Sequence, residues 1–99
     1  MLYRHGDVLV HLIPKLPEQA TERPGTILAR GELTGHSHRI QDPETVQLWQ
    51  LNGEIYIEVK TDVAHLIHEE HHTIPLPRGF YKSWMQREYT PKAIVRVRD

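Results

Sequence analysis

The histidines of this chain are concentrated in two short segments. Six of the eight lie in GHSHRI, with His36 and His38, and in HLIHEEHH, with His65, His68, His71 and His72. Imidazole is the commonest metal ligand in proteins and the side chain best suited to proton transfer near neutral pH. A chain that gathers so many imidazoles therefore predicts a site that binds a metal ion or moves protons.

The first cluster, His36-Ser-His38, has a spacing that favours two imidazoles on one side of a β-strand. Side chains at positions i and i+2 of a strand point to the same face, so both rings can approach a common point without backbone distortion. Gly35 beside them leaves room for a ligand or another strand. The alternative is an edge strand whose two histidines face the solvent.

The second cluster, His68-Glu-Glu-His71-His72, fits two backbone geometries. In an extended strand, His68, Glu70 and His72 would line one face. In a turn or helical fragment, His68 and His71 are three residues apart and can meet. The spacing differs from that of the H-E-x-x-H zinc motif. A charged surface loop is the competing interpretation.

The other histidines are expected to lie outside the site. In a regular strand His65 points away from His68, to the side of Val63 and Ile67, so we expect it to be packed in the core. The two remaining histidines, His5 and His11, are isolated in the sequence and receive no role.

The chain has no cysteine, which restricts the ligands of any bound metal. Disulfides, thiolate catalysis and cysteine-based zinc fingers are excluded. Nitrogen and oxygen ligands suit Zn, Fe(II), Mn, Ni or Co rather than Cu(I) or an iron–sulfur cluster. We therefore predict a divalent-metal site with two ligands from each cluster: His36, His38, His68 and His71.

Such a site would suit catalysis if it kept a coordination position open. Glu70 or His72 would then be a spare ligand or a general base. A metal-bound water of lowered pKa would act as nucleophile or base on a small polar or phosphorylated substrate.

A metal-independent ribonuclease is the second hypothesis, because clustered histidines also supply a general acid and a general base. The segment that follows Tyr81 would form a polar wall beside the histidines, where Lys82 or Arg87 would hold the phosphate and Tyr81 or Tyr89 would hydrogen-bond it. Aromatic residues such as Trp49 and Trp84 would stack on unpaired bases. The candidate catalytic residues of the two hypotheses are His36, His38, His68, Glu70, Lys82, Arg87 and Tyr89.

Two segments carry residues in the order of a known pair of motifs. They are Gly31, His36, His38, Glu44 and Gly53, followed by Pro77-Arg78-Gly79. This order resembles the cupins, whose first motif is a strand with H-x-H, then a glutamate and a glycine, and whose second motif contains P-x-G. The resemblance covers residues 31 to 82 and implies a double-stranded β-helix with metal-dependent chemistry on small molecules. Lys82 stands where cupins have a second-motif histidine, so HEEHH would supply that ligand.

The apolar pattern predicts an all-β fold, because it alternates with period two and shows no sustained helical spacing. Val46 to Leu51 and Glu54 to Lys60 flank Asn52-Gly53, the preferred pair for a type I′ hairpin turn. This register sets Val46 opposite Val59 and Leu48 opposite Ile57, with Trp49 and Tyr56 on the other face. Further strands are expected at 7–13, 26–30, 63–67, 73–76, 79–89 and 93–97, with a polar loop at 14–24.

These elements predict a single domain over residues 1–99, a small antiparallel sandwich or barrel. A non-enzymatic interaction module, which would form a homo-oligomer through its edge strands, is a third functional class. With 12 Lys and Arg against 13 Asp and Glu, the net charge of −1 gives no overall field for nucleic acid or anionic lipid. The absence of a long apolar stretch favours a cytoplasmic protein that does not enter the membrane. Neither a Gly-rich phosphate loop nor a G-x-S-x-G elbow is present, so NTPase and serine-hydrolase functions have no support.

Overall fold

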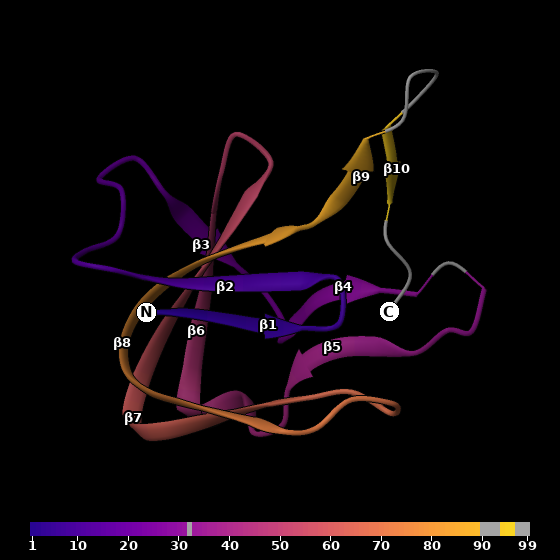
Figure 1. Ribbon diagram of the computed structural model, residues 1–99. Coiled ribbons are helices and arrows are strands. Elements are labelled where there is room, and N and C mark those ends of the chain that lie inside the picture. Colours follow the sequence, from indigo (N-terminus) through magenta and orange to yellow (C-terminus); the bar gives the residue numbers. More distant parts are fainter. Residues whose placement is uncertain (32, 90–93, 97–99) are drawn as a thin grey trace.

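The computed structural model describes residues 1–31, 33–89 and 94–96, with side chains for 1–31 and 33–86. The regular structure of the described chain is all β apart from one short 3₁₀ turn, as the sequence predicts (Figure 1). Its elements are β1 (Leu2–His5), β2 (Val8–Ile13), β3 (Thr21–Arg23), β4 (Ile27–Arg30), β5 (Ser37–Ile40), η1 (Pro43–Thr45), β6 (Val46–Leu51), β7 (Glu54–Ile67), β8 (Ile74–Met85), β9 (Arg87–Tyr89) and β10 (Ile94–Arg96).

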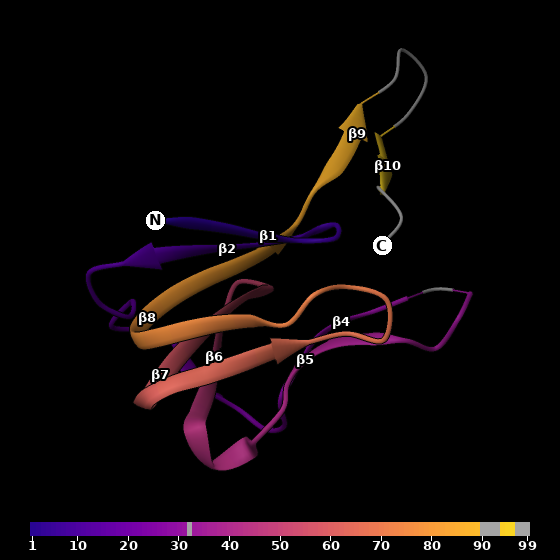
Figure 2. The same cartoon turned by 60° about the horizontal axis from the view of Figure 1, so that its bottom comes forward.

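Eight of the strands form one antiparallel sheet that curls into a half-barrel (Figures 1 and 2). The main path runs β1-β2-β8-β7-β5-β4, and β6 pairs with both β7 and β3. The long strands β7 and β8 pair with each other over two stretches of β7, Ile55 to Val59 and Val63 to Leu66. β9 and β10 form a separate two-stranded sheet beyond the end of β8.

β7 changes its partner near its centre. Its first half pairs with β6, while its end pairs with β5 through Leu66 and Ile67. The register against β8 shifts between Val59 and Val63. Arg78 stabilises this irregularity, since its guanidinium donates to the carbonyl oxygen of Lys60 at 2.5 Å. A shift of this kind bends a strand, and the bend brings the end of β7 to β5.

The predicted hairpin is confirmed in its turn and in its register. Asn52 and Gly53 both have positive φ, 52° and 79°, as a type I′ turn requires. Leu48 lies opposite Ile57, Val46 opposite Val59, and Trp49 opposite Tyr56. The first four of these side chains are buried, so this hairpin contributes one wall of the core.

The apolar core lies inside the curl of the sheet. Tyr81 is its largest fully buried side chain, and the hydroxyl of Tyr81 donates to the carbonyl oxygen of Pro77 at 2.6 Å. Burial raises the pKa of this phenol. The core residues are Val8, Val10, Leu28, Ile40, Val46, Leu48, Ile57, Val59, Ala64, Leu66, Leu76 and Tyr81.

Several predicted element boundaries are wrong. The expected loop over 14–24 contains β3, which pairs with β6 and so continues the sheet. The expected strand at 63–67 is the second half of β7. The segment 73–89 forms one strand to Met85 and a second from Arg87. β1, for which no strand was predicted, forms a hairpin with β2 through the turn Gly6-Asp7.

Among the described residues, no helix has the length and apolar character needed to span a membrane.

Candidate metal centre

The two histidine clusters meet at the end of β7. β5 carries His38 and pairs with the last residues of β7, directly before His68. Residues 68–73 form no strand, so the bent backbone of the predicted turn alternative applies here. It turns His71 back toward His68, and their ring centroids lie 4.7 Å apart. The turn after β7 and the strand β5 thus converge on one point.

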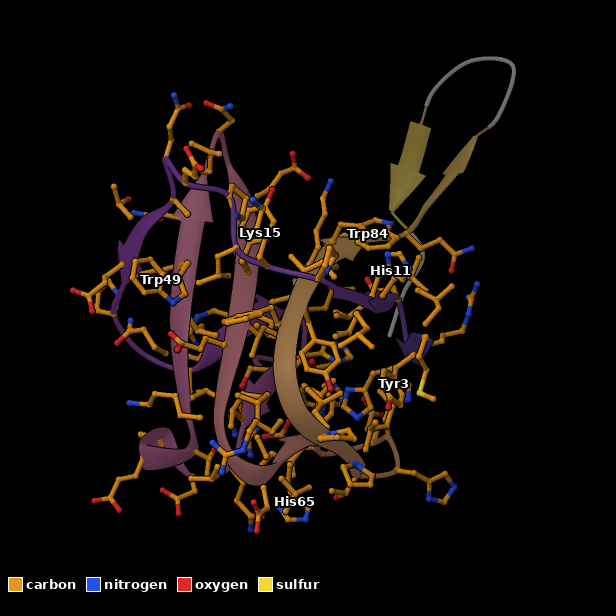
Figure 3. All side chains as sticks on the ribbon, turned by 90° about the vertical axis from the view of Figure 1, so that its left-hand side faces the viewer. Tyr3, His11, Lys15, Trp49, His65 and Trp84 are labelled. Atoms are coloured by element: carbon orange, nitrogen blue, oxygen red, sulfur yellow. The ribbon has the colours of Figure 1, made fainter. Side chains whose placement is uncertain are left out.

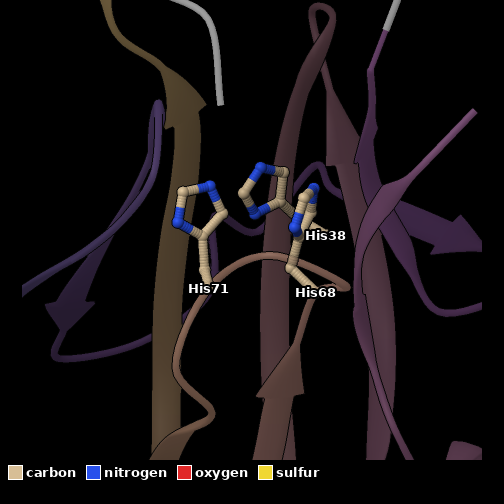
Figure 4. A group of neighbouring side chains, drawn as sticks. All are labelled: His38, His68 and His71. Atoms are coloured by element: carbon tan, nitrogen blue, oxygen red, sulfur yellow. The ribbon is translucent and has the colours of Figure 1, made fainter. Parts of the chain in front are cut away.

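Three histidines form the centre of this group: His38, His68 and His71 (Figure 4). One nitrogen of each ring lies within 4.8 Å of one nitrogen of each of the others. The ring centroids are 4.3, 4.7 and 5.6 Å apart. Three imidazoles on one tetrahedral zinc ion have centroids about 5 Å apart, because zinc–nitrogen bonds are about 2 Å long. The arrangement is therefore close to that of a three-histidine metal site.

His71 gives independent support for a bound ligand. Its Nε2 atom is buried and has no hydrogen-bond partner among the described residues. Gly6 lies against this atom, and a Cβ at Gly6 would come within 2.6 Å of it. The glycine thus leaves the space that the ring of His71 occupies. A buried polar atom without a partner costs free energy, and a metal ion would supply the missing partner.

Two buried side chains, His5 and Asp7, lie on either side of the His38 ring, and a chain of hydrogen bonds runs through His5. His5 Nε2 donates to the carbonyl oxygen of His72 at 2.8 Å, and the Nδ1 atoms of His5 and His38 are 2.9 Å apart. On the other side, the Nε2 of His38 lies 3.3 Å from the Oδ1 of Asp7. All three side chains, His5, Asp7 and His38, are buried.

The tautomer of His5 follows from this chain. A carbonyl oxygen only accepts hydrogen bonds, so the His5 ring carries a proton on Nε2. Burial lowers the pKa of His5 to about 4, against the opposing effect of the His72 carbonyl and with a further contribution from His71 and His68. The ring is therefore neutral at pH 7, and its Nδ1 is an acceptor facing His38.

His68 is also hydrogen-bonded within the turn. Its Nδ1 accepts the backbone N–H of Glu70 at 2.9 Å. A neutral ring in this state has its proton on Nε2. To bind a metal ion through Nε2, His68 would have to move that proton to Nδ1, and the Glu70 N–H would turn away.

A second, exposed group lies at the rim of the centre. It consists of His36, His68 and Glu69, again with one ligand atom each within 4.8 Å of the others. The Nδ1 of His36 lies 3.1 Å from the carboxylate of Glu70. His36 and His38 thus both approach His68, with centroid distances of 5.7 and 4.3 Å, but belong to different groups.

Glu69 is ionised across the ordinary pH range. Hydrogen bonds from its own backbone N–H and from that of Ser37, together with the guanidinium of Arg39, lower the pKa of Glu69 to about 2. The Arg39 guanidinium lies 3.1 Å from the Glu69 carboxylate, and the N–H of Ser37 donates to it at 3.2 Å.

Other predicted site residues lie elsewhere. Lys82 alternates with the core residues Tyr81 and Ser83, so it projects from the outer face of β8, where its ammonium pairs with Glu54 at 2.5 Å. Its predicted position beside the histidines is wrong. The hydrogen bond to Glu54 raises the pKa of Lys82. The side chains of Arg87 and Tyr89 lie outside the described residues.

Two histidines of the second cluster also differ from expectation. His65 is exposed and points away from the body of the molecule rather than packing in the core (Figure 3). Ala64 and Leu66 take the buried positions, and Val63 is 37% exposed. The face of β7 that carries Val63 and His65 therefore points outward. The side chain of His72 is exposed, and its contribution is the carbonyl oxygen that holds His5.

Sequence reasoning missed His5, Gly6 and Asp7. The signal was the pair Gly6-Asp7 between two alternating segments, which is typical of a two-residue hairpin turn with glycine first. Gly6 has the positive φ of 63° that such a turn requires. That turn would have placed His5 at the end of a strand and next to a carboxylate.

Comparison with known families gives one assignment. Residues 4–86 match the family model described as "Domain of unknown function (DUF8820)", and the chain belongs to this family. The matched region includes every residue of the centre described above. No curated protein and no solved structure matches the chain.

Proposed function

We propose that this protein binds one divalent transition-metal ion through His38, His68 and His71. The observation that carries the proposal is the buried Nε2 of His71, which has no hydrogen-bond partner among the described residues. One nitrogen of the same ring lies within 4.8 Å of one nitrogen of each of two further imidazoles. Imidazole ligands favour zinc, cobalt, nickel or iron(II) over magnesium or calcium.

The surroundings of His38 support the same proposal. Metal-bound histidines usually have their second ring nitrogen hydrogen-bonded to a carboxylate, a carbonyl or water, which sets the tautomer and the orientation of the ring. His38 has Asp7 at one nitrogen and His5 at the other. Because the His5 Nδ1 is an acceptor, the His38 Nδ1 carries the proton, and the Nε2 beside Asp7 is the atom that would bind the ion.

Three histidine ligands leave a coordination position for a small polar molecule, and an ion in such a site can polarise a substrate oxygen as a Lewis acid. The burial of His38 and His68, 1% and 7% exposed, limits that substrate to a small molecule. The chain would bind and orient it from the rim, where Arg39 and His36 are partly exposed.

The ribonuclease hypothesis has less support. It relied on Lys82 or Arg87 as the cation next to the acid–base pair, but Lys82 projects from the outer face of the sheet toward Glu54, and the side chain of Arg87 lies outside the described residues. It also needs histidines that an RNA phosphate can reach, whereas the most closely spaced rings, His38 and His68, are buried. RNA cleavage that persists in EDTA would favour it nonetheless.

Metal analysis of untagged protein, purified without a metal resin, tests the proposal. We expect one equivalent of metal per chain, retained after gel filtration and lost from the His71→Ala variant. His65→Ala is the matched control, since it removes an exposed imidazole from the same segment and should keep the full equivalent. A folded wild-type chain that takes up no zinc, cobalt, nickel or iron(II) would overturn the proposal.

A further inference from the structure

We propose that the rim group, His36, His68 and Glu69, is a transient site that a metal ion binds first, before it passes to the buried three-histidine centre. This inference rests on the proposed metal binding and adds the route by which the ion arrives. It follows from the overlap of two groups of potential ligands that differ in exposure and share one ring.

The rim group is accessible to an ion in solution. The side chain of His36 is 33% exposed and that of Glu69 39% exposed. Glu70, 55% exposed, lies 3.1 Å from the Nδ1 of His36 and so orients this ring as a carboxylate orients a metal-bound histidine. The carboxylates of Glu69 and Glu70 both lie at this rim, and the Arg39 guanidinium offsets the charge of Glu69, so the Glu70 carboxylate supplies the attraction for cations from solution.

The exposure of the imidazoles falls along a continuous row of rings. His36 is partly exposed, His68 is 7% exposed and His38 is 1% exposed. The ring centroids of His36 and His68 are 5.7 Å apart, and those of His68 and His38 are 4.3 Å apart. Both distances are within about 1 Å of the centroid spacing of about 5 Å expected for two imidazoles on one metal ion.

His68 belongs to both groups, so it connects the rim to the centre. An ion that moves from the rim to the centre would exchange His36 and Glu69 for His38 and His71 and stay beside this ring. Because each step replaces one ligand by another, the ion never returns to full hydration on the way. Sharing of His68 also disfavours two ions bound at the same time, since one ring would have to bridge two cations.

The rate of metal uptake tests this route. Stopped-flow mixing of metal-free protein with Co²⁺, followed by the visible absorption of the bound ion, gives the association rate constant. Transfer to excess EDTA gives the dissociation rate constant. We expect the double variant His36→Ala/Glu69→Gln to slow both by about tenfold, the range over which charged groups near a site change association rates. The ratio of the two constants should be preserved, because the final ligands are unchanged.

Two controls define the outcomes. His65→Ala/Glu18→Gln removes the same residue types from exposed positions outside the group and should leave both rates unchanged. His71→Ala should instead speed release, because it removes a final ligand. If wild-type protein binds Co²⁺ and the rim variant takes it up at the wild-type rate, the entry route is wrong while metal binding stands. Two equivalents of Co²⁺ per chain would also overturn the route, in favour of two simultaneous sites.

Discussion

The two ends of β7 lead to buried side chains of opposite chemistry. One end follows the Asn52-Gly53 turn, and the other leads into the segment that begins at His68. The first half carries Ile57 and Val59, which are 0% and 2% exposed and pack with apolar partners from β6. The other end leads into His68, which is 7% exposed and lies among imidazoles and carboxylates. We call the β6–β7 hairpin with its buried aliphatic side chains the apolar half of the sheet. The region of His5, Asp7, His38, His68 and His71 is the histidine half.

The difference indicates which half stabilises the fold and which half serves another purpose. Burial of an aliphatic side chain contributes about 1.5–3 kcal/mol, whereas a buried polar group contributes little even when it is hydrogen-bonded. His5, His38 and Asp7 are all nearly inaccessible to solvent. A hydrocarbon core in their place would be the simpler route to stability, so their presence supports a function for the histidine half.

The largest expected effect comes from the apolar half. Leu48→Ala removes a side chain that is 0% exposed and should lower the free energy of unfolding by about 2–5 kcal/mol, from lost burial and the cavity left behind. Urea denaturation measures the change. Leu12→Ala, at a position 41% exposed, is the control and should cost far less. The folded fraction of Leu48→Ala should still bind one metal equivalent, and loss of metal would contradict the separation of the two halves.

The histidine half should make the metal-free protein sensitive to acid. The pKa of His5 is about 4 in the folded chain and 6.5 as its ordinary value. Between these values the unfolded chain binds the proton that the folded chain excludes, so the free energy of unfolding falls as the pH drops from 6.5 to 4. The loss attributable to His5 is at most about 3 kcal/mol. Urea denaturation in EDTA at a series of pH values measures it.

Matched glutamine variants separate this effect from other titrations. His5→Gln should flatten the pH dependence in this window, while His11→Gln, at an exposed position, should keep the wild-type slope. The depressed pKa of Glu69 acts at lower pH, since its stabilisation is present above 4.5 and is lost as the pH falls toward 2. An unchanged slope in His5→Gln would show that burial of this ring is not responsible.

Much of the fold could be predicted from local sequence, because its signals are local. Asn52-Gly53 specifies a turn type, and the turn fixes the register of Leu48 against Ile57. The partner change of β7 could not be predicted, since it depends on a register shift and on Arg78 from another strand. β3 was missed for a related reason: three residues carry too little pattern, and β6 supplies the edge that makes them a strand.

For the candidate site, the sequence predicted that the two clusters meet, but not which residues take part. His38, His68 and His71 were recognisable as clustered imidazoles, whereas His5 joins them through the β1–β2 hairpin, far away in the sequence. His65 was misplaced because alternation tells which residues share a face but not which face is inside. Here Ala64 and Leu66 take the inside.

Metal binding to the histidine half should raise the free energy of unfolding. An ion that binds only the folded chain adds about 2.7 kcal/mol to the free energy of unfolding when its concentration is 100 times the dissociation constant. We expect Zn²⁺ to raise the denaturation midpoint of the wild-type protein, EDTA to reverse the rise, and His38→Ala to abolish it. Leu12→Ala should respond like the wild type. Equal stabilisation of the His38→Ala variant would mean that zinc binds elsewhere.

The smallest effect on stability is expected at Gly6, where it should be accompanied by a specific effect on binding. Gly6 and Gly25 both have positive φ, 63° and 86°, so alanine at either position should cost about 1–2 kcal/mol of backbone strain. They differ in their surroundings. A Cβ at Gly6 would lie 2.6 Å from the Nε2 of His71, whereas nothing lies within 4 Å of a Cβ at Gly25. Gly6→Ala should therefore displace the ring of His71 and weaken metal binding, which isothermal titration with Zn²⁺ measures, while Gly25→Ala should keep the wild-type affinity. If the two variants lose stability equally and bind zinc equally, the close contact at Gly6 has no part in shaping the site.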